Sequence, residues 1–456
     1  VHPQKKKVLP DKSSLVAKTA AFADGAQPPG SRRLLAMNRF WKMLSGFLAL
    51  IAAIHVYEKV FGPALPSGEV QAEKKTDRTP PTWLRCSAND TDRYALGPRS
   101  RVLVTGGAGF IGSAVMARLG EPSRKRERGS AAAADDPRRG GQHDGPPGTV
   151  VGLDNFNDYY SPAYKRARAA RVEGAAGFRV VEGDVCNASL LEALFAEHDF
   201  THVIHLAAQA GVRYSLTHPL SYVRNNLECF VTLLERVRRH PTAPAFVYAS
   251  SSSVYGRNRK IPFAETDPAT NPANLYGASK FANEQIAAAY HHIYDLASVG
   301  LRFFTVYGPW GRPDMAAFLF TRAVELGKPL TLYNRGEMRR DFTYVDDVVD
   351  GIVASAQFCA RAPAVFNLGN NRPVELLHFI ETIERELGAT ASVVHKQSFA
   401  EIKETYADID KARALLGYNP KTSIEEGMKR FIQWYKQEPR RHAFATGGDF
   451  NNRRRR

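Results

Sequence analysis

From position 101 onward, short apolar runs alternate along the chain with longer stretches of helical character. The runs are rich in Val, Ile, Leu and Phe, and Gly, Asp, Ala or Ser ends them, which is typical of strands buried on both faces of a sheet. Alternation of strand and helix over roughly 200 residues predicts an α/β fold with a doubly wound parallel sheet. The expected strands span 102–104, 149–154, 178–185, 202–208, 245–256 and 299–308.

The first expected strand leads into the glycine-rich segment Thr105–Gly112, and a helical stretch follows at 113–119. Strand, glycine turn and helix form the context of a dinucleotide-binding fingerprint, although the spacing Gly-x-x-Gly-x-x-Gly differs from Gly-x-Gly-x-x-Gly. Glycines let the backbone approach a pyrophosphate, and the N-terminus of the helix offers N–H groups to it. The cofactor-binding residues expected here are Gly106, Gly109, Phe110, Ile111 and Gly112.

The second expected strand ends in Asp154, where a carboxylate can bind the ribose hydroxyls of adenosine. An acid at this position, rather than an Arg, favours NAD over NADP. Residues 120–148 lengthen the sequence between the glycine-rich segment and Asp154. They are rich in Arg, Ala, Gly and Pro, and we interpret them as a disordered insertion. Asp184 lies near the end of the third expected strand, where its side chain can contact the adenine. Asn155, Val185 and Ala207 complete the expected set, and the small residues near Ala207 leave room for the cofactor.

Tyr276 and Lys280 are four residues apart and therefore lie on one face of the helix expected there. A phenol with a pKa of about 10 is a poor base at neutral pH, and a fixed ammonium one turn away would lower that pKa. Such a phenolate can take the proton of a sugar hydroxyl while hydride leaves the same carbon. The hydroxyl side chains of Ser250–Ser253 follow the fifth expected strand, at the edge of the sheet where ligands bind.

The sequence before position 101 predicts a tail, a membrane anchor and a stem. Residues 1–39 are basic and polar, and we expect them to be disordered. The uncharged run 43–54 is short for a bilayer span, but aromatic and Lys residues flank it within 40–61. Lys and Arg precede this segment and Glu follows it, so the positive-inside rule places the rest of the chain across the membrane. A cleaved signal peptide and a buried helix are alternatives, and 62–100 is interpreted as the stem.

Charge and cysteine content exclude some classes of function. The net charge of +16 is concentrated before position 43 and after position 438, so the folded part is only mildly basic and is not expected to bind nucleic acid. The hydrophobic content of 44% is enough for a sizeable core. The cysteines are far apart and include no Cys-x-x-Cys pair, so we expect buried thiols rather than a disulfide framework or a metal site. They are Cys86, Cys186, Cys229 and Cys359.

Between position 101 and about position 436 the chain resembles the extended short-chain dehydrogenase/reductase family of nucleotide-sugar enzymes. Within that family it is similar to the UDP-glucuronate 4-epimerases of the membrane-anchored plant and algal type. The resemblance implies a Rossmann-like sheet, a smaller C-terminal substrate domain and a homodimer. The segments that carry it are Thr105–Gly112, Leu153–Tyr160, His205–Arg213, Ser250–Gly256, Tyr276–Lys280, Arg302–Met315 and Arg340–Asp347.

The resemblance also implies tightly held NAD and a reversible hydride cycle at C4 of the sugar. Tyr276 would exchange a proton with the 4-hydroxyl and would also contact the cofactor. Lys280 would bind the nicotinamide ribose, and Ser251 would hydrogen-bond the 4-oxygen. Arg312 would pair with the carboxylate of the substrate, and Arg340 matches the arginine that binds the diphosphate. The implied substrate-binding residues are Arg213, Ser252, Thr305, Arg312 and Arg340.

Related activities stay open. A 4,6-dehydratase needs an acid pair after its catalytic Ser or Thr, and a uronate decarboxylase carries a Glu there, but this chain has Ser252 and Ser253. This favours simple epimerisation of UDP-glucuronate to UDP-galacturonate, which would supply the synthesis of pectin-type polysaccharides. UDP-glucose is the alternative substrate, and a membrane-tethered nucleotide-binding protein without catalysis is the alternative from another class. The chain departs from the family pattern at 120–148 and at 397–402.

The expected organisation has an NAD-binding Rossmann domain at 101–310 and a substrate-binding part at 311–438. Segments near 341–370 are expected to return to the Rossmann domain, and 439–456 to form a disordered tail. The anchor and the resemblance together predict a single-pass type II membrane protein with a lumenal catalytic domain. We expect the membrane to be that of the Golgi, with another endomembrane as the alternative.

Overall fold

The computed structural model describes residues 94–121, 147–396 and 404–444. The expected N-terminal tail, the membrane anchor and most of the stem lie outside these residues, as do most of the insertion, the departure at 397–402 and most of the C-terminal tail. Among the helices within the described ranges, none is long and apolar enough to cross a membrane.

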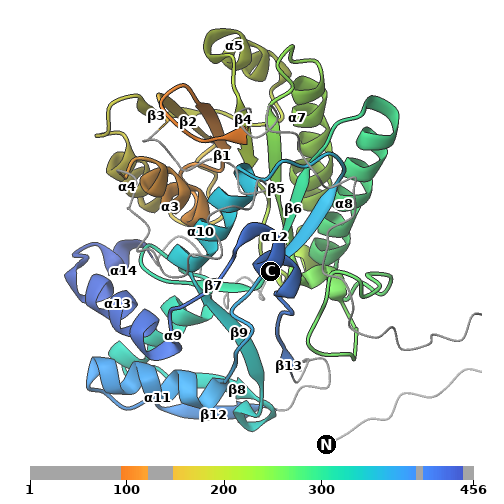
Figure 1. Cartoon of the computed structure of the whole chain (residues 1–456). Coiled ribbons are helices and arrows are strands. Elements are labelled where there is room, and N and C mark those ends of the chain that lie inside the picture. The colour runs from red at the N-terminus through yellow and green to blue at the C-terminus, as the bar shows by residue number, and fades with distance from the viewer. Residues whose placement is uncertain (1–93, 122–146, 397–403, 445–456) are drawn as a thin grey trace, which may run out of the picture. The chain divides into compact units, whose positions relative to one another are not determined.

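Seven parallel strands form the main sheet, in the order β10-β6-β5-β4-β1-β2-β3 (Figure 1). The strand order reverses between β1 and β4, which is the point where doubly wound sheets bind ligands at the carboxyl ends of their strands. The predicted doubly wound parallel sheet is confirmed. Its strands are β1 (Arg101–Thr105), β2 (Thr149–Asp154), β3 (Phe178–Glu182), β4 (His202–His205), β5 (Ala245–Ser251), β6 (Val299–Phe303) and β10 (Ala364–Leu368).

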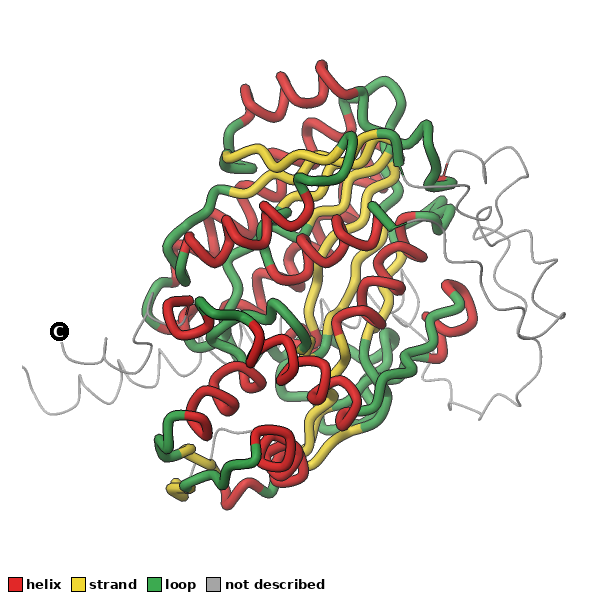
Figure 2. The backbone as a smooth tube through the Cα atoms, turned by 90° about the vertical axis from the view of Figure 1, so that its left-hand side faces the viewer, coloured by secondary structure: helices red, strands yellow, loops and turns green. Residues whose placement is uncertain are grey.

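Helices cover both faces of this sheet (Figure 2). Successive strand residues point to opposite faces, so Val102 and Val104 of β1 pack into one core and Leu103 into the other. The first core includes Val115 of α3 and Val348 of α10. The helices on that side are α3 (Phe110–Leu119), α4 (Pro162–Val172) and α10 (Val345–Ala356), and those on the other are α5 (Ala188–His198), α7 (Cys229–Arg238) and α8 (Leu275–Tyr294).

The sixth expected strand is interrupted at Phe304. Residues before it stay in the main sheet as β6, whereas β7 (Thr305–Tyr307) turns away and pairs with β9 (Arg339–Tyr344) of a smaller, four-stranded sheet. Thr305 therefore begins the strand that leads into the smaller sheet. That sheet also contains β11 (Pro373–Glu375) and β13 (Glu404–Thr405), and β8 (Leu330–Tyr333) pairs with β12 (Val393–Lys396). The remaining α-helices are α9 (Ala316–Glu325), α11 (Leu376–Leu387), α12 (Asp410–Leu416), α13 (Ile424–Gln437) and α14 (Arg441–Phe444).

Three strands end earlier than the sequence predicted. β3 stops at Glu182, β4 at His205 and β5 at Ser251. The residues beyond them leave the ladder and form loops and short helical turns at the carboxyl edge of the sheet, where side chains can point at a ligand. These turns are η4 (Tyr214–Leu216), α6 (Pro219–Tyr222), the π-helix η5 (Val223–Glu228) and η6 (Ser252–Tyr255), and η7 (Asn334–Gly336) follows β8.

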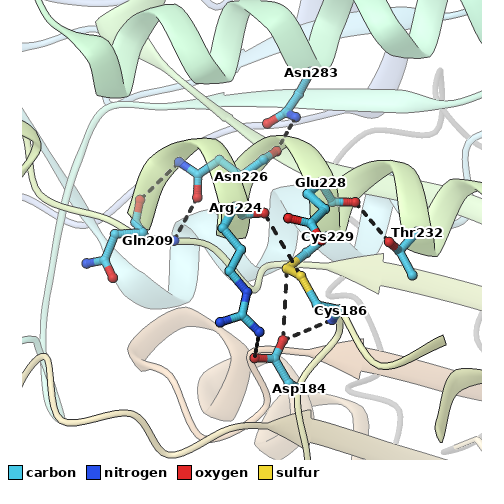
Figure 3. Close-up of a disulfide and its surroundings, with 9 residues drawn as sticks. All are labelled: Asp184, Cys186, Gln209, Arg224, Asn226, Glu228, Cys229, Thr232 and Asn283. Atoms are coloured by element: carbon cyan, nitrogen blue, oxygen red, sulfur yellow. Dashed lines mark hydrogen bonds and ion pairs between the residues drawn. A yellow bond between two sulfur atoms is a disulfide. The ribbon is translucent and has the colours of Figure 1, made fainter. Parts of the chain in front are cut away.

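Cys186 and Cys229 form a disulfide (Figure 3), and the expectation of buried thiols was therefore wrong for this pair. Cys186 lies in the loop after β3, and Cys229 is the first residue of α7. Cys359 is disulfide-bonded as well, so the expectation was also wrong for this cysteine. Sequence spacing could not reveal the pair, because only the fold brings the β3–α5 loop beside the start of α7.

Candidate active site

Glycine is required at two positions of the turn between β1 and α3. Gly106 has a φ of +71°, and a Cβ there would lie 2.9 Å from a backbone nitrogen of the loop after β4. A Cβ on Gly112 would overlap the carbonyl oxygen of Gly106. Gly109 donates its N–H to that carbonyl at 2.8 Å, and α3 begins at the next residue. Phe110 and Ile111 thus form the helix N-terminus beside a turn whose one side chain is the buried methyl of Ala108, which suits a pyrophosphate.

Asp154 ends β2 beside this turn and fixes its shape. Its carboxylate accepts the N–H of Ala108 at 3.2 Å and the N–H of Phe156 at 2.9 Å. Ala207, in the loop after β4, donates its N–H to the hydroxyl of Thr105 at 3.2 Å. The loops that follow β1, β2 and β4 are therefore joined by hydrogen bonds at one edge of the sheet.

Asp184 and Val185 follow β3 at the same edge. The carboxylate of Asp184 accepts the N–H of Cys186 at 2.9 Å and lies 3.8 Å from the guanidinium of Arg224 (Figure 3). Val185 is buried, and Asn155 is exposed after β2. The predicted cofactor residues gather at the carboxyl ends of β1 to β4, and this arrangement fits a dinucleotide.

Helix α8 brings Tyr276 and Lys280 to the carboxyl end of β5. Asn274 caps the helix by accepting a backbone N–H of its first turn at 2.8 Å. The hydroxyl of Tyr276 is hydrogen-bonded to that of Ser251, and the ammonium of Lys280 donates to the carbonyl of Ala249 at 2.8 Å. The three predicted catalytic side chains therefore lie at one junction of β5 and α8.

The protonation of Tyr276 is controlled by opposing effects. Burial raises its pKa, whereas the hydrogen bond with Ser251 and the charge of Arg312 lower it. Lys280, which the sequence predicted to lower this pKa, is not among the described groups that do so. Its ammonium is turned toward the Ala249 carbonyl, and burial lowers the pKa of Lys280 itself to about 8. The groups that lower the pKa of Tyr276 are therefore Ser251 and Arg312.

Arg312 lies between β7 and α9 and forms a bidentate ion pair with Asp314. Nε lies 3.0 Å from Oδ1, and the second contact, from NH2 to Oδ2, is 2.5 Å. Tyr159 donates its hydroxyl to the same carboxylate at 2.9 Å. Burial alone would lower the pKa of Arg312, but Asp314 outweighs it and raises the pKa. The site thus holds a fixed cation that already has a carboxylate partner.

The other predicted substrate residues lie on several elements. Ser252 begins η6 and is half-buried. Thr305 begins β7 and lines a small pocket together with Arg312. Arg213 is exposed directly before η4, and Arg340 is half-buried on β9. The structure therefore brings Thr305 beside Arg312, whereas Arg213 and Arg340 lie on elements outside the junction of β5 and α8.

Asn226 is a site residue that the sequence analysis missed. It lies in the π-helix η5, where its side chain accepts the N–H of Gln209 at 2.8 Å and donates to the hydroxyl of Ser279 at 2.9 Å. Asn283 donates to the carbonyl of Asn226 at 2.6 Å (Figure 3). Asn226 therefore ties the loop after β4 to the catalytic helix α8. A π-helix interrupts the 3.6-residue period and often marks a functional site, so the apolar pattern gave no sign of it.

Comparisons with known proteins identify the family of this chain. The model of the NAD dependent epimerase/dehydratase family matches residues 102–369. UDP-glucuronate 4-epimerase 4 of Arabidopsis thaliana is 45% identical over 375 residues, which cover 78% of this chain and 80% of the relative. UDP-glucuronate 4-epimerase 2 of the same plant is 40% identical over 438 residues, which cover 89% of this chain and 94% of the relative.

Solved structures show the same relationship. UDP-glucuronic acid 4-epimerase from Bacillus cereus, in complex with UDP-glucuronic acid and NAD, aligns with a TM-score of 0.64 at 32% identity and covers 74% of this chain and 99% of its own. UDP-glucose 4-epimerase from Thermotoga maritima, with UDP-glucose, aligns with a TM-score of 0.60 at 27% identity and the same coverage. The predictions of the family and of NAD as cofactor are confirmed. The glycine turn, the Ser–Tyr–Lys junction and these matches place the chain in the NAD dependent epimerase/dehydratase family.

Proposed function

We propose that the protein is an isomerase that interconverts UDP-glucuronate and UDP-galacturonate at C4 of the sugar. The observation that carries this proposal is the half-buried guanidinium of Arg312, which Asp314 holds in place and whose charge lowers the pKa of Tyr276. A hexose bound with its 4-hydroxyl at Tyr276 would have its carboxylate, on the neighbouring carbon C5, close to this cation. The names of the similar plant and Bacillus cereus proteins support the same substrate.

The residues at the junction of β5 and α8 account for the proton transfer. Ser251 hydrogen-bonds Tyr276 and can hold the sugar 4-oxygen beside it, so that Tyr276 takes the proton of the 4-hydroxyl during oxidation. Tyr276 returns that proton to the 4-oxygen when the keto sugar is reduced on its other face. NAD, when bound, supplies the hydride acceptor and donor for C4.

The residues after Ser251 argue against elimination or decarboxylation. Ser252 and Ser253 are half-buried hydroxyls in η6, where a dehydratase or decarboxylase would need a carboxyl group. A hydroxyl with its ordinary pKa cannot protonate a leaving hydroxide as a carboxylic acid does. The site therefore supports inversion at C4 without loss of any substrate atom.

The proposal is tested by incubating the full-length protein with each uronate separately and resolving the nucleotide sugars by anion exchange. Each uronate should give the same equilibrium mixture without net formation of NADH. Tyr276→Phe should abolish the conversion. Tyr290→Phe is the matched control, because Tyr290 lies on the same helix but bonds Glu235, at 2.8 Å. Turnover of UDP-glucose with no conversion of either uronate would contradict the proposal.

One observation favours UDP-glucose as a second candidate substrate. Asp314 already neutralises Arg312, and a neutral hexose would not have to compete with that carboxylate. The similarity to the Thermotoga maritima UDP-glucose 4-epimerase points the same way. Arg312→Ala separates the two candidates, since it should weaken binding of UDP-glucuronate far more than binding of UDP-glucose. Equal effects on the two ligands would mean that Arg312 does not recognise the carboxylate.

The proposal extends to the cellular location. A single-pass type II anchor at 40–61 would hold the catalytic domain in the Golgi lumen, where UDP-galacturonate would supply pectin-type polysaccharide synthesis. The basic residues before this segment and the acidic residues after it support that orientation. In intact Golgi vesicles the catalytic domain should resist added protease until detergent opens the membrane. Digestion without detergent would contradict a lumenal domain.

The proposal also includes a homodimer. Leu216 is 75% exposed and Leu220 is 80% exposed. They lie on η4 and α6, which both contact the catalytic helix α8. Exposed leucines so close together are typical of an interaction surface. Light scattering after size exclusion should give the mass of two chains, and Leu220→Glu should give that of one. Leu377→Glu, at an exposed leucine of α11, is the control and should stay dimeric.

A further inference from the structure

Arg168 is a buried cation for which the proton transfer and the predicted site residues give no role. It lies on α4 with an exposed fraction of 0%. One nitrogen, NH1, donates to the hydroxyl of Tyr160 at 2.6 Å and to the carbonyl of Ala108 at 3.5 Å. Nε and NH2 donate to the carbonyl of Trp310 at 3.0 and 2.6 Å, and NH2 also donates to that of Gly311 at 3.2 Å. A single guanidinium thus joins three separate loops.

The charge of Arg168 has no carboxylate partner among the residues that the structure describes. Its hydrogen-bond acceptors are neutral oxygens, and its guanidinium lies over the rings of Tyr164, at 4.1 Å, and Tyr160, at 5.3 Å. Burying a cation without an opposite charge is unfavourable. The position of Arg168 therefore has to be explained by what its N–H groups hold in place.

One end of this arrangement is a strained turn. Gly311 donates its N–H to the carbonyl of Gly308 at 3.0 Å, and Trp310 between them has a φ of +63°. A positive φ at this position of a turn with Pro at the previous residue is typical of a type II turn, which normally places Gly there. A bulky residue adopts this conformation only when its surroundings enforce it. The two N–H groups of Arg168 on the Trp310 carbonyl help to hold it, together with the rings of Tyr164 and Trp434 that pack on the Trp310 side chain.

The other end is the cofactor turn. Ala108 accepts from Arg168 through its carbonyl, while its N–H donates to the carboxylate of Asp154. The guanidinium therefore links the turn that would cradle the pyrophosphate to the loop that carries Arg312, with short hydrogen bonds to Trp310 and a long one, of 3.5 Å, to Ala108. No other described side chain hydrogen-bonds to both of these segments.

We propose that Arg168 is a positioning residue, which holds loop 308–312 against the glycine turn so that Arg312 faces the carboxylate of the sugar. This rests on the proposed function, because it assigns Arg168 to recognition of the uronate. Arg168 itself is buried beneath the loops and acts through Arg312. Its loss should therefore change the preference between ligands with and without a carboxylate, which a role in stability alone would leave unchanged.

The test measures dissociation constants of UDP-glucuronate and UDP-glucose for the NAD-loaded protein by calorimetry. Arg168→Lys keeps the charge but cannot span both loops, because an ammonium lacks the planar fork of a guanidinium. It should raise the dissociation constant of UDP-glucuronate about tenfold and that of UDP-glucose about twofold or less. Arg171→Lys is the matched control: it lies one turn further along α4 and covers the ring of Trp310 at 4.9 Å without bonding its carbonyl. It should change neither constant.

A double-mutant cycle establishes the route through Arg312. In an Arg312→Ala background, Arg168→Lys should have little further effect on binding of the uronate. If Arg168→Lys does not fold, Tyr160→Phe carries the test, because it removes only the hydroxyl that orients the guanidinium. It should shift the preference in the same direction by a smaller factor.

Two results would overturn the proposal while the proposed function stands: a wild-type preference for the uronate that these variants leave intact, or additive effects of Arg168→Lys and Arg312→Ala. A wild-type protein that binds UDP-glucose better than either uronate would overturn the proposed function, and with it the assignment of Arg168 to the uronate.

Discussion

Asp314 binds the guanidinium of Arg312 from one side, through Nε at 3.0 Å and NH2 at 2.5 Å. This geometry leaves NH1 outside the pair, so a substrate carboxylate can reach the cation only beside an existing negative charge. Tyr159 adds a third contact by donating to Asp314 at 2.9 Å. The same carboxylate thus stabilises the half-buried cation and weakens its attraction for a second acid.

Removal of this competing charge should strengthen uronate binding. Asp314→Asn keeps a hydrogen-bonding side chain of the same shape but leaves Arg312 with its full charge. A gain of roughly 1–2 kcal/mol is expected at an effective dielectric constant near 20, which corresponds to UDP-glucuronate binding about tenfold more tightly. Binding of UDP-glucose should change little. Calorimetric titration of both ligands checks this.

The control for this variant is Asp350→Asn, at an exposed acid that pairs with Arg118 on the surface. It should alter neither affinity. Weaker uronate binding in Asp314→Asn, comparable to that in Arg312→Ala, would contradict the prediction. It would mean that Asp314 serves chiefly to orient Arg312.

Ser251 should control the pH at which Tyr276 becomes a base. Its hydrogen bond lowers the pKa of Tyr276, which burial raises. The base must be deprotonated, so the rate rises with pH through this pKa, and loss of Ser251 should move that rise to higher pH. Ser251→Ala should also lower kcat at neutral pH by about 100-fold. Profiles of kcat against pH for the wild type and the variant give both quantities.

Ser253→Ala is the matched control, since Ser253 contacts Ser251 through its backbone N–H, at 3.2 Å, which the substitution keeps. Its pH profile should be that of the wild type. An unshifted profile in Ser251→Ala would show that Ser251 does not act on the Tyr276 pKa.

The features that the sequence predicted well depend on residues that lie close together in the sequence. The β1 strand, its glycine turn and the helix after it lie within Arg101–Leu119, and each position has a local reason for its residue type. Asp154 could be predicted despite the insertion because a strand end and an acid form a recognisable pair. The spacing of Tyr276 and Lys280 likewise follows from one helix.

The features that the sequence missed depend on contacts between distant segments. Tyr159 and Asp314 are 155 residues apart, and Asn226 acts from within a π-helix that periodicity cannot show. Helical spacing placed Lys280 on the face of Tyr276 but could not show that its long side chain turns toward the Ala249 carbonyl. Local pattern thus predicts where a side chain is attached, and the packing around it determines where its polar end goes.

Titration of Lys280 should make the free energy of unfolding larger at alkaline pH than at neutral pH. Burial lowers its pKa from 10.5 to about 8 in the folded state. The folded protein therefore releases this proton first as the pH rises, and between about pH 8 and 10.5 the unfolded chain binds more protons, so the free energy of unfolding increases with pH. The full increment is about 3 kcal/mol. Urea unfolding of the cofactor-free protein at pH 7.5 to about 10 measures it.

Lys280→Met isolates this effect from other groups that titrate at alkaline pH. The difference in unfolding free energy between the wild type and the variant should become more favourable to the wild type as the pH rises through about 8. A difference that is constant over this range would show that Lys280 keeps an ordinary pKa in the folded protein.

The disulfide between Cys186 and Cys229 should contribute measurably to stability. It joins residues 43 positions apart, and closing a loop of this length in the unfolded chain corresponds to about 4 kcal/mol in the chain-entropy description. It also anchors the loop that carries Asp184, whose carboxylate bonds the Cys186 N–H. The Cys186→Ser/Cys229→Ser variant should therefore unfold at a lower urea concentration than the wild type under oxidising conditions.

Reduction provides the internal control for this pair. Dithiothreitol, which is itself oxidised to a cyclic disulfide as the two cysteines gain two electrons and two protons, should destabilise the wild type more than the double variant. The remaining effect on the double variant measures the disulfide of Cys359 and any others. Equal urea midpoints for the oxidised wild type and the double variant would mean that the cross-link does not restrict the unfolded chain. If the double variant lost NAD while its urea midpoint stayed unchanged, the disulfide would instead act on the loop of Asp184.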